Sequence, residues 1–347
     1  MNFTQILFIQ CILIASVGME FQSQPDPIWI DTDIGIGKLN KDVDDGIALI
    51  MALKSPKVDI RGISLVGNTD YGYKMCMRLI QWYHDSPIKI PVCKGARNSD
   101  DSETENQAVR SMAEALSHEK MTIIALGPLT NISHLLIAHP ELKSNIIKII
   151  WCGGRSPNTH FKPGSGKVSV CDCNFDHDDA AAQVVINTGV PVILAGYEAA
   201  ENIYLSAEDI LPLKTSTYPG DQWVYHQLKS WQNFWSIFLN SKSGFIPFDA
   251  VTMGCFLYPE LTLTQSQVPV HITVMKNDTP WRLFKPEKKY LLAASGLPSS
   301  HKVDFCAETL TGMKAEILKL LICPPPKQQD DHDSSFLTGI DPITIIK

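Results

Sequence analysis

Five aspartates lie between two apolar runs near the amino-terminal end of the sequence. The stretch is IWIDTDIGIGKLNKDVDDGIALIMAL, residues 28–53, and its acids are Asp31, Asp33, Asp42, Asp44 and Asp45. Carboxylates this close together repel one another unless a cation lies among them. Carboxylates combined with backbone carbonyls form a site of hard oxygen ligands, which suits Ca²⁺ or Mg²⁺ better than zinc. In the alternative, purely structural interpretation, the D-D pair caps a helix and the D-T-D ends a strand. Because both motifs occur together, the sequence favours the cation site.

The elements that must position these acids alternate between short β-rich runs and helical patterns, from residue 28 to about residue 200. This alternation predicts an α/β fold with an open, doubly wound, mostly parallel sheet in a single domain. Ligands of such sheets bind beyond the carboxyl ends of the strands. Polar segments follow four of the predicted strands here: DTD, GN with Asn68, LGPLTN and CGG. The first loop lacks the G-x-G-x-x-G spacing, so it is a better cradle for a cation than for a dinucleotide.

The remainder of the chain contains fewer signals. Residues 220–240 are predicted to form an aromatic-rich helix, and residues 267–275 and 288–295 to form strands. Residues 303–322 are predicted to form a closing helix.

Several motifs resemble those of the nucleoside hydrolases, in the same order along the chain. DTDIG…DVDDGIALIMAL resembles the amino-terminal signature of that family, D-T-D-x-G-x-D-D-A-x-A-L. The match continues through SLVGN (64–68), IALGPLTNIS (124–133), WCGG (151–154), DCNFDHDDAAAQVV (172–185) and PFDAV (247–251). The resemblance implies an enzyme that hydrolyses the N-glycosidic bond of ribonucleosides, releasing base and ribose.

The resemblance also implies roles for individual residues. A calcium ion would be held by three carboxylates and one backbone carbonyl, those of Asp33, Asp45, Asp249 and Leu126. The ribose hydroxyls would be bound by Asp44, Asn68, Asp172 and Asn174. Asp33 would also take the proton of the attacking water and is therefore the expected catalytic base. Asp31 is expected to support the strand end from behind, and no role is expected for Asp42.

The sequence departs from the family pattern at several points. The first loop carries an insertion (residues 34–43) that separates Asp33 from Asp44. The E-F-N motif reads DCN, and Cys152 stands where a methionine usually lines the substrate site. The segment 155–171 is expanded.

The identity of the leaving base depends on aromatic residues. Phe248 occupies the position that a histidine has in the inosine–uridine branch of the family. An aromatic residue at this position resembles the purine-specific branch, where the base stacks on an aromatic ring. Trp231 and Trp235 are four residues apart on a predicted helix and could form the opposite face of such a stack. These residues therefore predict a purine preference; the alternative is that they only pack the core.

Two other functions remain open at this point. One is a non-catalytic, exported protein that binds nucleosides or calcium. The other is a magnesium-dependent phosphatase of the haloacid-dehalogenase type, whose first strand also ends in D-x-D, although Gly35 does not fit its usual pattern. Cys171 and Cys173 have no nearby cysteine or histidine pair and are not expected to bind zinc.

The composition and the two ends of the chain indicate which classes of ligand and which cellular location to expect. The net charge is −7 with acids and bases interspersed, which argues against nucleic-acid binding and favours a small polar ligand. Residues 1–24 are predicted to form a signal peptide or an uncleaved N-terminal anchor, so we expect an exported protein, secreted or periplasmic, with no other membrane segment. The domain is expected at 27–323 and a partly disordered tail at 324–347. The family resemblance further implies a homo-oligomer.

Overall fold

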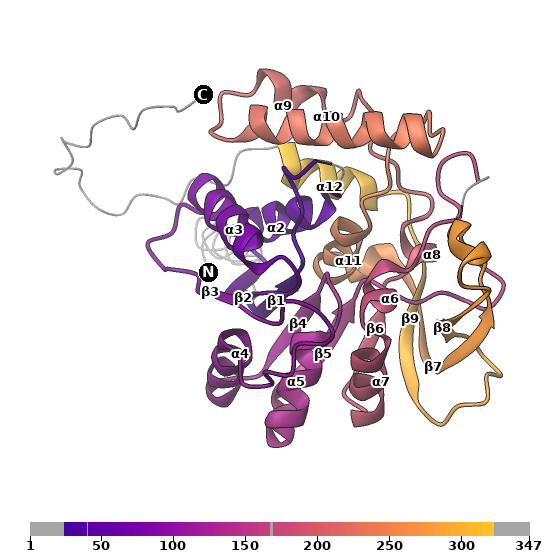
Figure 1. Cartoon of the computed structure of the whole chain (residues 1–347). Coiled ribbons are helices and arrows are strands. Elements are labelled where there is room, and N and C mark those ends of the chain that lie inside the picture. Colours follow the sequence, from indigo (N-terminus) through magenta and orange to yellow (C-terminus); the bar gives the residue numbers. More distant parts are fainter. Residues whose placement is uncertain (1–23, 40, 167–168, 323–347) are drawn as a thin grey trace, which may run out of the picture.

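The computed structural model of the chain describes residues 24–39, 41–166 and 169–322 (Figure 1). The predicted leader falls outside these residues, except for residue 24, and the predicted tail lies wholly outside them. None of the helices in the described segments combines the length and the apolar character needed to cross a bilayer.

A nine-stranded sheet forms the centre of the described part of the chain, in the order β3-β2-β1-β4-β5-β6-β9-β7-β8. Every pairing is parallel from β3 to β9, whereas β7 pairs antiparallel with both β9 and β8. The predicted α/β fold with a mostly parallel sheet is therefore confirmed. The strands are β1 (Asp26–Thr32), β2 (Val58–Leu65), β3 (Val92–Lys94), β4 (Met121–Ala125), β5 (Ile146–Trp151), β6 (Val192–Leu194), β7 (Thr262–Lys276), β8 (Glu287–Ala293) and β9 (Lys302–Thr309).

Helices cover both faces of the sheet, as a doubly wound fold requires (Figure 1). The alternation of β1 shows how the two cores arise, because Ile28 and Ile30 belong to one buried cluster and Trp29 to the other. The first cluster includes residues of α2 (Asp44–Lys54), α3 (Thr69–Tyr83), α10 (Asp221–Phe238), α11 (Phe248–Leu257) and α12 (Met313–Ile322). The second includes residues of α4 (Gln107–His118), α5 (Thr130–Ala138) and α7 (Asp179–Thr188). The shorter helices are α6 (Cys173–His177), α8 (Tyr197–Ala200) and α9 (Leu211–Thr215).

The prediction of one closing helix at 303–322 is wrong for its first part. Residues 302–309 form β9, which lies between β6 and β7 and pairs with both. Val303 and Phe305 are buried, while Lys302 and Asp304 before and between them are more exposed, which is the period of a strand and not of a helix. The helix α12 begins only at Met313, after Gly312.

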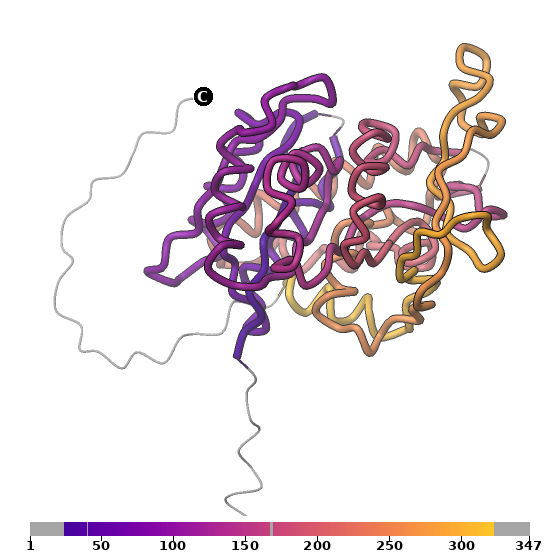
Figure 2. The backbone as a smooth tube through the Cα atoms, turned by 90° about the horizontal axis from the view of Figure 1, so that it is seen from below, coloured from indigo at the N-terminus to yellow at the C-terminus, as the bar shows by residue number. Residues whose placement is uncertain are grey.

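The antiparallel pair β7–β8 extends away from the body of the molecule (Figure 2). Its base contacts the expanded segment 155–171, because the Ala293 amide donates to the Arg155 carbonyl oxygen at 3.0 Å. The Arg155 guanidinium and the His160 ring both contact the Asp278 carboxylate, at 2.8 and 2.6 Å. These contacts hold the expanded segment against the sheet beside the site described next.

Candidate functional site

The site forms where two neighbouring strands end. β1 lies between β2 and β4, and the chain order reverses at this point of the sheet. Asp31 pairs with Ala125, and the Leu126 amide donates to the Asp31 carbonyl oxygen at 2.8 Å. Asp33 and Leu126, which follow β1 and β4, therefore emerge side by side. This reversal of strand order is where open α/β sheets bind ligands.

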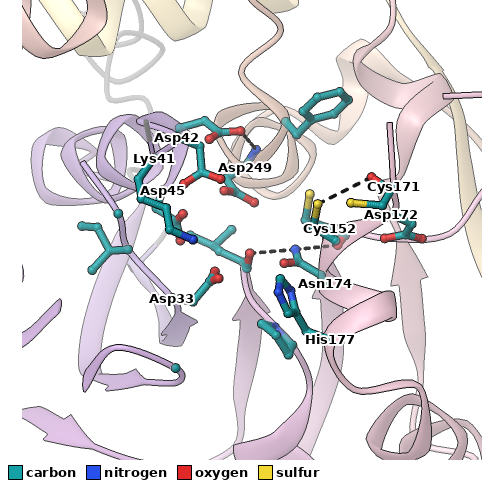
Figure 3. Close-up of a pocket in the computed structure, with 18 of the residues that line it drawn as sticks. Asp33, Lys41, Asp42, Asp45, Cys152, Cys171, Asp172, Asn174, His177 and Asp249 are labelled. Atoms are coloured by element: carbon teal, nitrogen blue, oxygen red, sulfur yellow. Dashed lines mark hydrogen bonds between the residues drawn. The ribbon is translucent and has the colours of Figure 1, made fainter. Parts of the chain in front are cut away.

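One cavity of about 900 Å³ collects every site residue that the sequence predicts. Figure 3 shows Asp33, Asp45 and Asp249 on one side of it, facing Cys152, Asp172 and Asn174. The predicted residues that line it are Asp33, Asp44, Asp45, Asn68, Leu126, Cys152, Asp172, Asn174, Trp231, Trp235, Phe248 and Asp249. Their shared location agrees with the predicted roles, which themselves stay predictions.

The first turn of α2 aims two carboxylates into the cavity. The Thr32 hydroxyl, at the end of β1, donates to the Asp45 carboxylate. The Asp249 amide, in the first turn of α11, donates to the Asp44 carboxylate at 3.3 Å. Both carboxylates are buried, with exposed fractions of 5% for Asp44 and 2% for Asp45. The strand and the two helices thus fix the directions of these acids.

The acids raise one another's pKa values. Burial, followed by the charge of Asp42, raises the pKa of Asp33 to about 7 and that of Asp44 to about 8. Burial and neighbouring carboxylates raise the pKa values of Asp45 and Asp249 well above the ordinary range. No lysine, arginine or histidine of the described segments forms an ion pair with any of these carboxylates. Clustered carboxylates and an adjacent backbone carbonyl are the donors that a hard divalent cation prefers, so the residues present fit Ca²⁺.

The opposite side of the cavity carries an amide and a carboxylate. The Asn174 amide donates to the carbonyl oxygens of Leu126 and Cys152, at 2.8 and 2.9 Å. The Asp172 carboxylate accepts from the Gly154 amide at 2.7 Å, and burial raises its pKa to about 6. Asn68 lies exposed at the beginning of α3, and its side chain makes no capping hydrogen bond.

Aromatic side chains form another part of the wall. Phe248 is half-buried, with its ring 6.2 Å from that of Tyr197. Trp231 stacks on Phe234, with centroids 4.9 Å apart and planes at 3°, and Trp235 is only 4% exposed. Trp235 thus belongs to the core and also lines the cavity, and its stacking on a base stays a prediction. The motifs did not indicate five further aromatic lining residues, which are Tyr71, Phe161, Tyr197, Phe234 and Phe238.

Sequence reasoning missed three polar residues of the insertion, of which Lys38 is one. Lys41 and Asp42 line the cavity, and one carboxylate oxygen of Asp42 lies within 4.8 Å of oxygens of Asp44 and Asp45. Asp42 precedes the D-D pair by two residues, and this spacing could have indicated that it lies near the site. From here on, "the acidic cluster" means the carboxylates of Asp33, Asp42, Asp44, Asp45 and Asp249.

Asp31 lies behind the cluster, as expected. Its carboxylate is fully buried and accepts hydrogen bonds from the Ser64 hydroxyl and, at 2.8 Å, from the Asn131 amide. Cys171 and Cys173 line the cavity, and among the described residues neither belongs to a group of three or more side chains placed to hold a metal ion. Across the described segments, the group of side chains suited to a metal ion is Asp42, Asp44 and Asp45.

Comparisons with known proteins agree on one family. The sequence profile described as "Inosine-uridine preferring nucleoside hydrolase" matches residues 28–282. A pyrimidine-specific ribonucleoside hydrolase, RihA, of Escherichia coli is 29% identical over 271 residues, covering 69% of this chain and 81% of that protein. RihA of Escherichia fergusonii is 27% identical over 269 residues, with the same coverage.

Solved structures share the fold. A purine-preferring ribonucleoside hydrolase from Gardnerella vaginalis superposes with a TM-score of 0.69 at 17% identity, covering 86% of this chain and 98% of that one. A plant nucleoside hydrolase gives a TM-score of 0.68 at 19% identity, covering 86% of this chain and 100% of that one.

Proposed function

Because this chain belongs to the inosine-uridine preferring nucleoside hydrolase family, we propose that it hydrolyses ribonucleosides with bound calcium and prefers purine nucleosides. Membership makes the chain an N-glycosyl hydrolase, and the phosphatase alternative is set aside. The observation that carries the calcium proposal is the convergence of Asp33, Asp45, Asp249 and Leu126 at one cavity, beside the strand-order reversal.

The proposed calcium site uses the carboxylates of Asp33, Asp45 and Asp249 and the carbonyl oxygen of Leu126. When bound, calcium supplies a positive charge that polarises the nucleophilic water and helps to orient the ribose. The Leu126 carbonyl already accepts a hydrogen bond from the Asn174 amide, and its second lone pair is free for a further partner. The amide therefore fixes this carbonyl in place.

The side chains around the ribose perform the remaining steps. Asp33 takes the proton of the attacking water, so its carboxylate must be ionised when the water attacks. Asp44, Asp172, Asn68 and Asn174 bind the ribose hydroxyls and hold the anomeric carbon beside that water. The carboxylates also stabilise the positive charge that develops on the ribose ring as the base departs.

The base preference rests on the aromatic wall. A purine offers a larger ring surface than a pyrimidine for stacking on Phe248 and on the rings around it. The named relatives have opposite preferences, since RihA is described as pyrimidine-specific and the Gardnerella vaginalis enzyme as purine-preferring. The comparisons therefore do not favour either base, and the purine proposal is supported by the aromatic wall.

The test is release of reducing sugar from inosine and uridine by the full chain, with calcium and after treatment with a chelator. We expect a higher kcat/KM for inosine, loss of activity on chelation and recovery on adding calcium. A strong preference for uridine would contradict the stacking proposal, and full activity in chelator would contradict the calcium proposal. Binding of nucleosides without base release would instead support the non-catalytic alternative.

We also propose export, on the apolar run from Ile6 to Val17 in the amino-terminal sequence. Expression of the full chain in a secreting host and determination of the amino terminus of the product test this. A product that stays inside the cell with its leader intact would contradict it.

A further inference from the structure

The insertion is anchored at both of its ends. Ile34, Ile36 and Val43 are each at most 2% exposed and belong to the first core cluster. The Tyr71 hydroxyl, on α3, donates to the Ile36 carbonyl oxygen at 2.9 Å. Gly37 has a φ of +89° and lies against the ring of Trp223 on α10. The core therefore sets the path of the insertion at each end, whereas Lys41 and Asp42 are exposed.

This path brings Asp42 into the acidic cluster. One Asp42 oxygen lies within 4.8 Å of carboxylate oxygens of Asp44 and Asp45. The Asp42 side chain also approaches Gly35 so closely that a Cβ added there would lie 3.0 Å from the Asp42 carboxylate oxygen. Glycine at position 35 thus leaves room for this carboxylate.

The surroundings of Asp42 point to a cation as the missing partner. Asp45 and Asp249 are 2% and 6% exposed, and no ion pair neutralises them within the described segments. Buried carboxylates are normally paired or bound to a metal. Asp42 adds a further negative charge to this group, and its charge is the strongest that acts on both Asp33 and Asp44.

Lys41 brings the opposite charge to the same place. Its side chain lines the cavity and is drawn beside Asp42 and Asp45 in Figure 3. Its charge acts on Asp33 and on Asp42, lowering the pKa of each, without an ion pair closer than 4.0 Å. The insertion therefore adds one carboxylate and one ammonium group to the cluster.

We propose that these two residues belong to the divalent-cation site. Asp42 supplies a carboxylate beyond those of Asp33, Asp45 and Asp249, and Lys41 is a resident counter-charge that opposes binding of the cation. This proposal rests on the proposed calcium site and assigns new roles to residues of the insertion. It predicts that removing either charge changes calcium affinity, in opposite directions.

The experiment is isothermal titration of the chelator-treated full chain with calcium chloride. For Asp42→Asn we expect an affinity about tenfold lower, because one charge close to the cation is lost. For Lys41→Gln we expect an affinity severalfold higher. Lys38→Gln is the matched control. Lys38 lies on the same insertion and lines the same cavity, but its ammonium group lies over the ring of Tyr71, at 5.8 Å from its centroid, and its charge is not among the main ones that act on the acidic cluster. We expect less than a twofold change for this variant.

Two outcomes would overturn the proposal: calcium affinity unchanged by Asp42→Asn, or a shift in the same direction for both variants. Thermal unfolding of each metal-free variant shows whether it folds. If Asp42→Asn does not fold, Asp42→Ser carries the same test. Nucleoside hydrolysis by the unsubstituted chain distinguishes the two proposals. An inactive chain whose calcium affinity shifts as expected would contradict the proposed function alone.

Discussion

At the scale of single residues, Asp33 is both a predicted metal ligand and the predicted base. Burial and Asp42 raise its pKa to about 7, so in the absence of metal its carboxylate is largely protonated below neutral pH. A cation bound beside it would favour the ionised form that can accept a proton.

Replacing Asp33 with Asn should lower kcat by about 10²- to 10⁴-fold, the usual contribution of a general base. The amide has nearly the same shape as the carboxylate, so the fold should persist. Steady-state kinetics on inosine and thermal unfolding measure the two effects. A folded Asp33→Asn protein with normal turnover would disprove the assignment.

Replacing Phe248 with Leu should reduce kcat/KM for inosine by about 2- to 10-fold, the value of one aromatic contact. Leucine keeps much of the apolar bulk but cannot stack. Uridine serves as the internal control, because its smaller ring loses less. An equal loss for both nucleosides would show that Phe248 packs the site without selecting the base.

The candidate site residues within the motifs could be predicted from the sequence, and all of them line one cavity. Lys41 and Asp42 could not, because they lie on an insertion for which the family pattern offers no counterpart. Phe161 and Tyr197 were also missed, since lone aromatic residues in loops or short helices carry no periodic signal. Phe161 lies on the expanded segment, which contacts β7–β8, and its ring lies 4.8 Å from that of Tyr197.

At the scale of elements, the insertion depends on its contact with α10. A Cβ at Gly37 would lie 2.7 Å from the Trp223 ring, and its φ of +89° disfavours any other residue. Gly296 offers a matched comparison, because its φ is +84° but nothing lies within 4 Å of its built Cβ.

We therefore expect Gly37→Ala to lower the free energy of unfolding by about 1–3 kcal/mol more than Gly296→Ala, the usual effect of overpacking. Denaturant titration of both variants measures the difference. Because the insertion carries Asp42, calcium affinity should also fall in Gly37→Ala and stay unchanged in Gly296→Ala. Equal stabilities would show that the insertion does not depend on this packing.

Most helices and strands follow the predicted alternation of β-rich runs and helical patterns from residue 28 to about residue 200. The strand β9 could not be predicted, because VDFCAET precedes a strongly helical pattern and its partners β6 and β7 are distant in sequence. Pairing across such separations leaves no local signal. The same limitation applies to α11, whose amino-terminal residues appeared only as the motif PFDAV.

At the scale of the whole molecule, the acidic cluster links stability to pH and calcium. The cluster's folded pKa values lie above the unfolded value of about 4, near 7 for Asp33 and 8 for Asp44. Between the unfolded and the folded pKa values, the folded state binds more protons than the unfolded state. The free energy of unfolding therefore decreases as pH rises through this range.

The metal-free chain should consequently unfold at a lower temperature at pH 8 than at pH 5.5. Calcium should stabilise it more at pH 8, because the cation competes with protons for the same carboxylates. At about 100 times the Kd, the gain should be about 4 °C for a chain of this size. Scanning calorimetry at both pH values checks this, and a calcium effect that does not depend on pH would contradict it.

The insertion has a consequence for how such enzymes diversify. Asp33 is held by the end of β1, where the Val66 amide donates to the Thr32 carbonyl oxygen at 3.0 Å, while Asp45 is held by the first turn of α2. The loop between them fixes neither side chain. Its charges can therefore be changed by substitution or grafting to retune cation affinity, while Asp33 and Asp45 keep their positions.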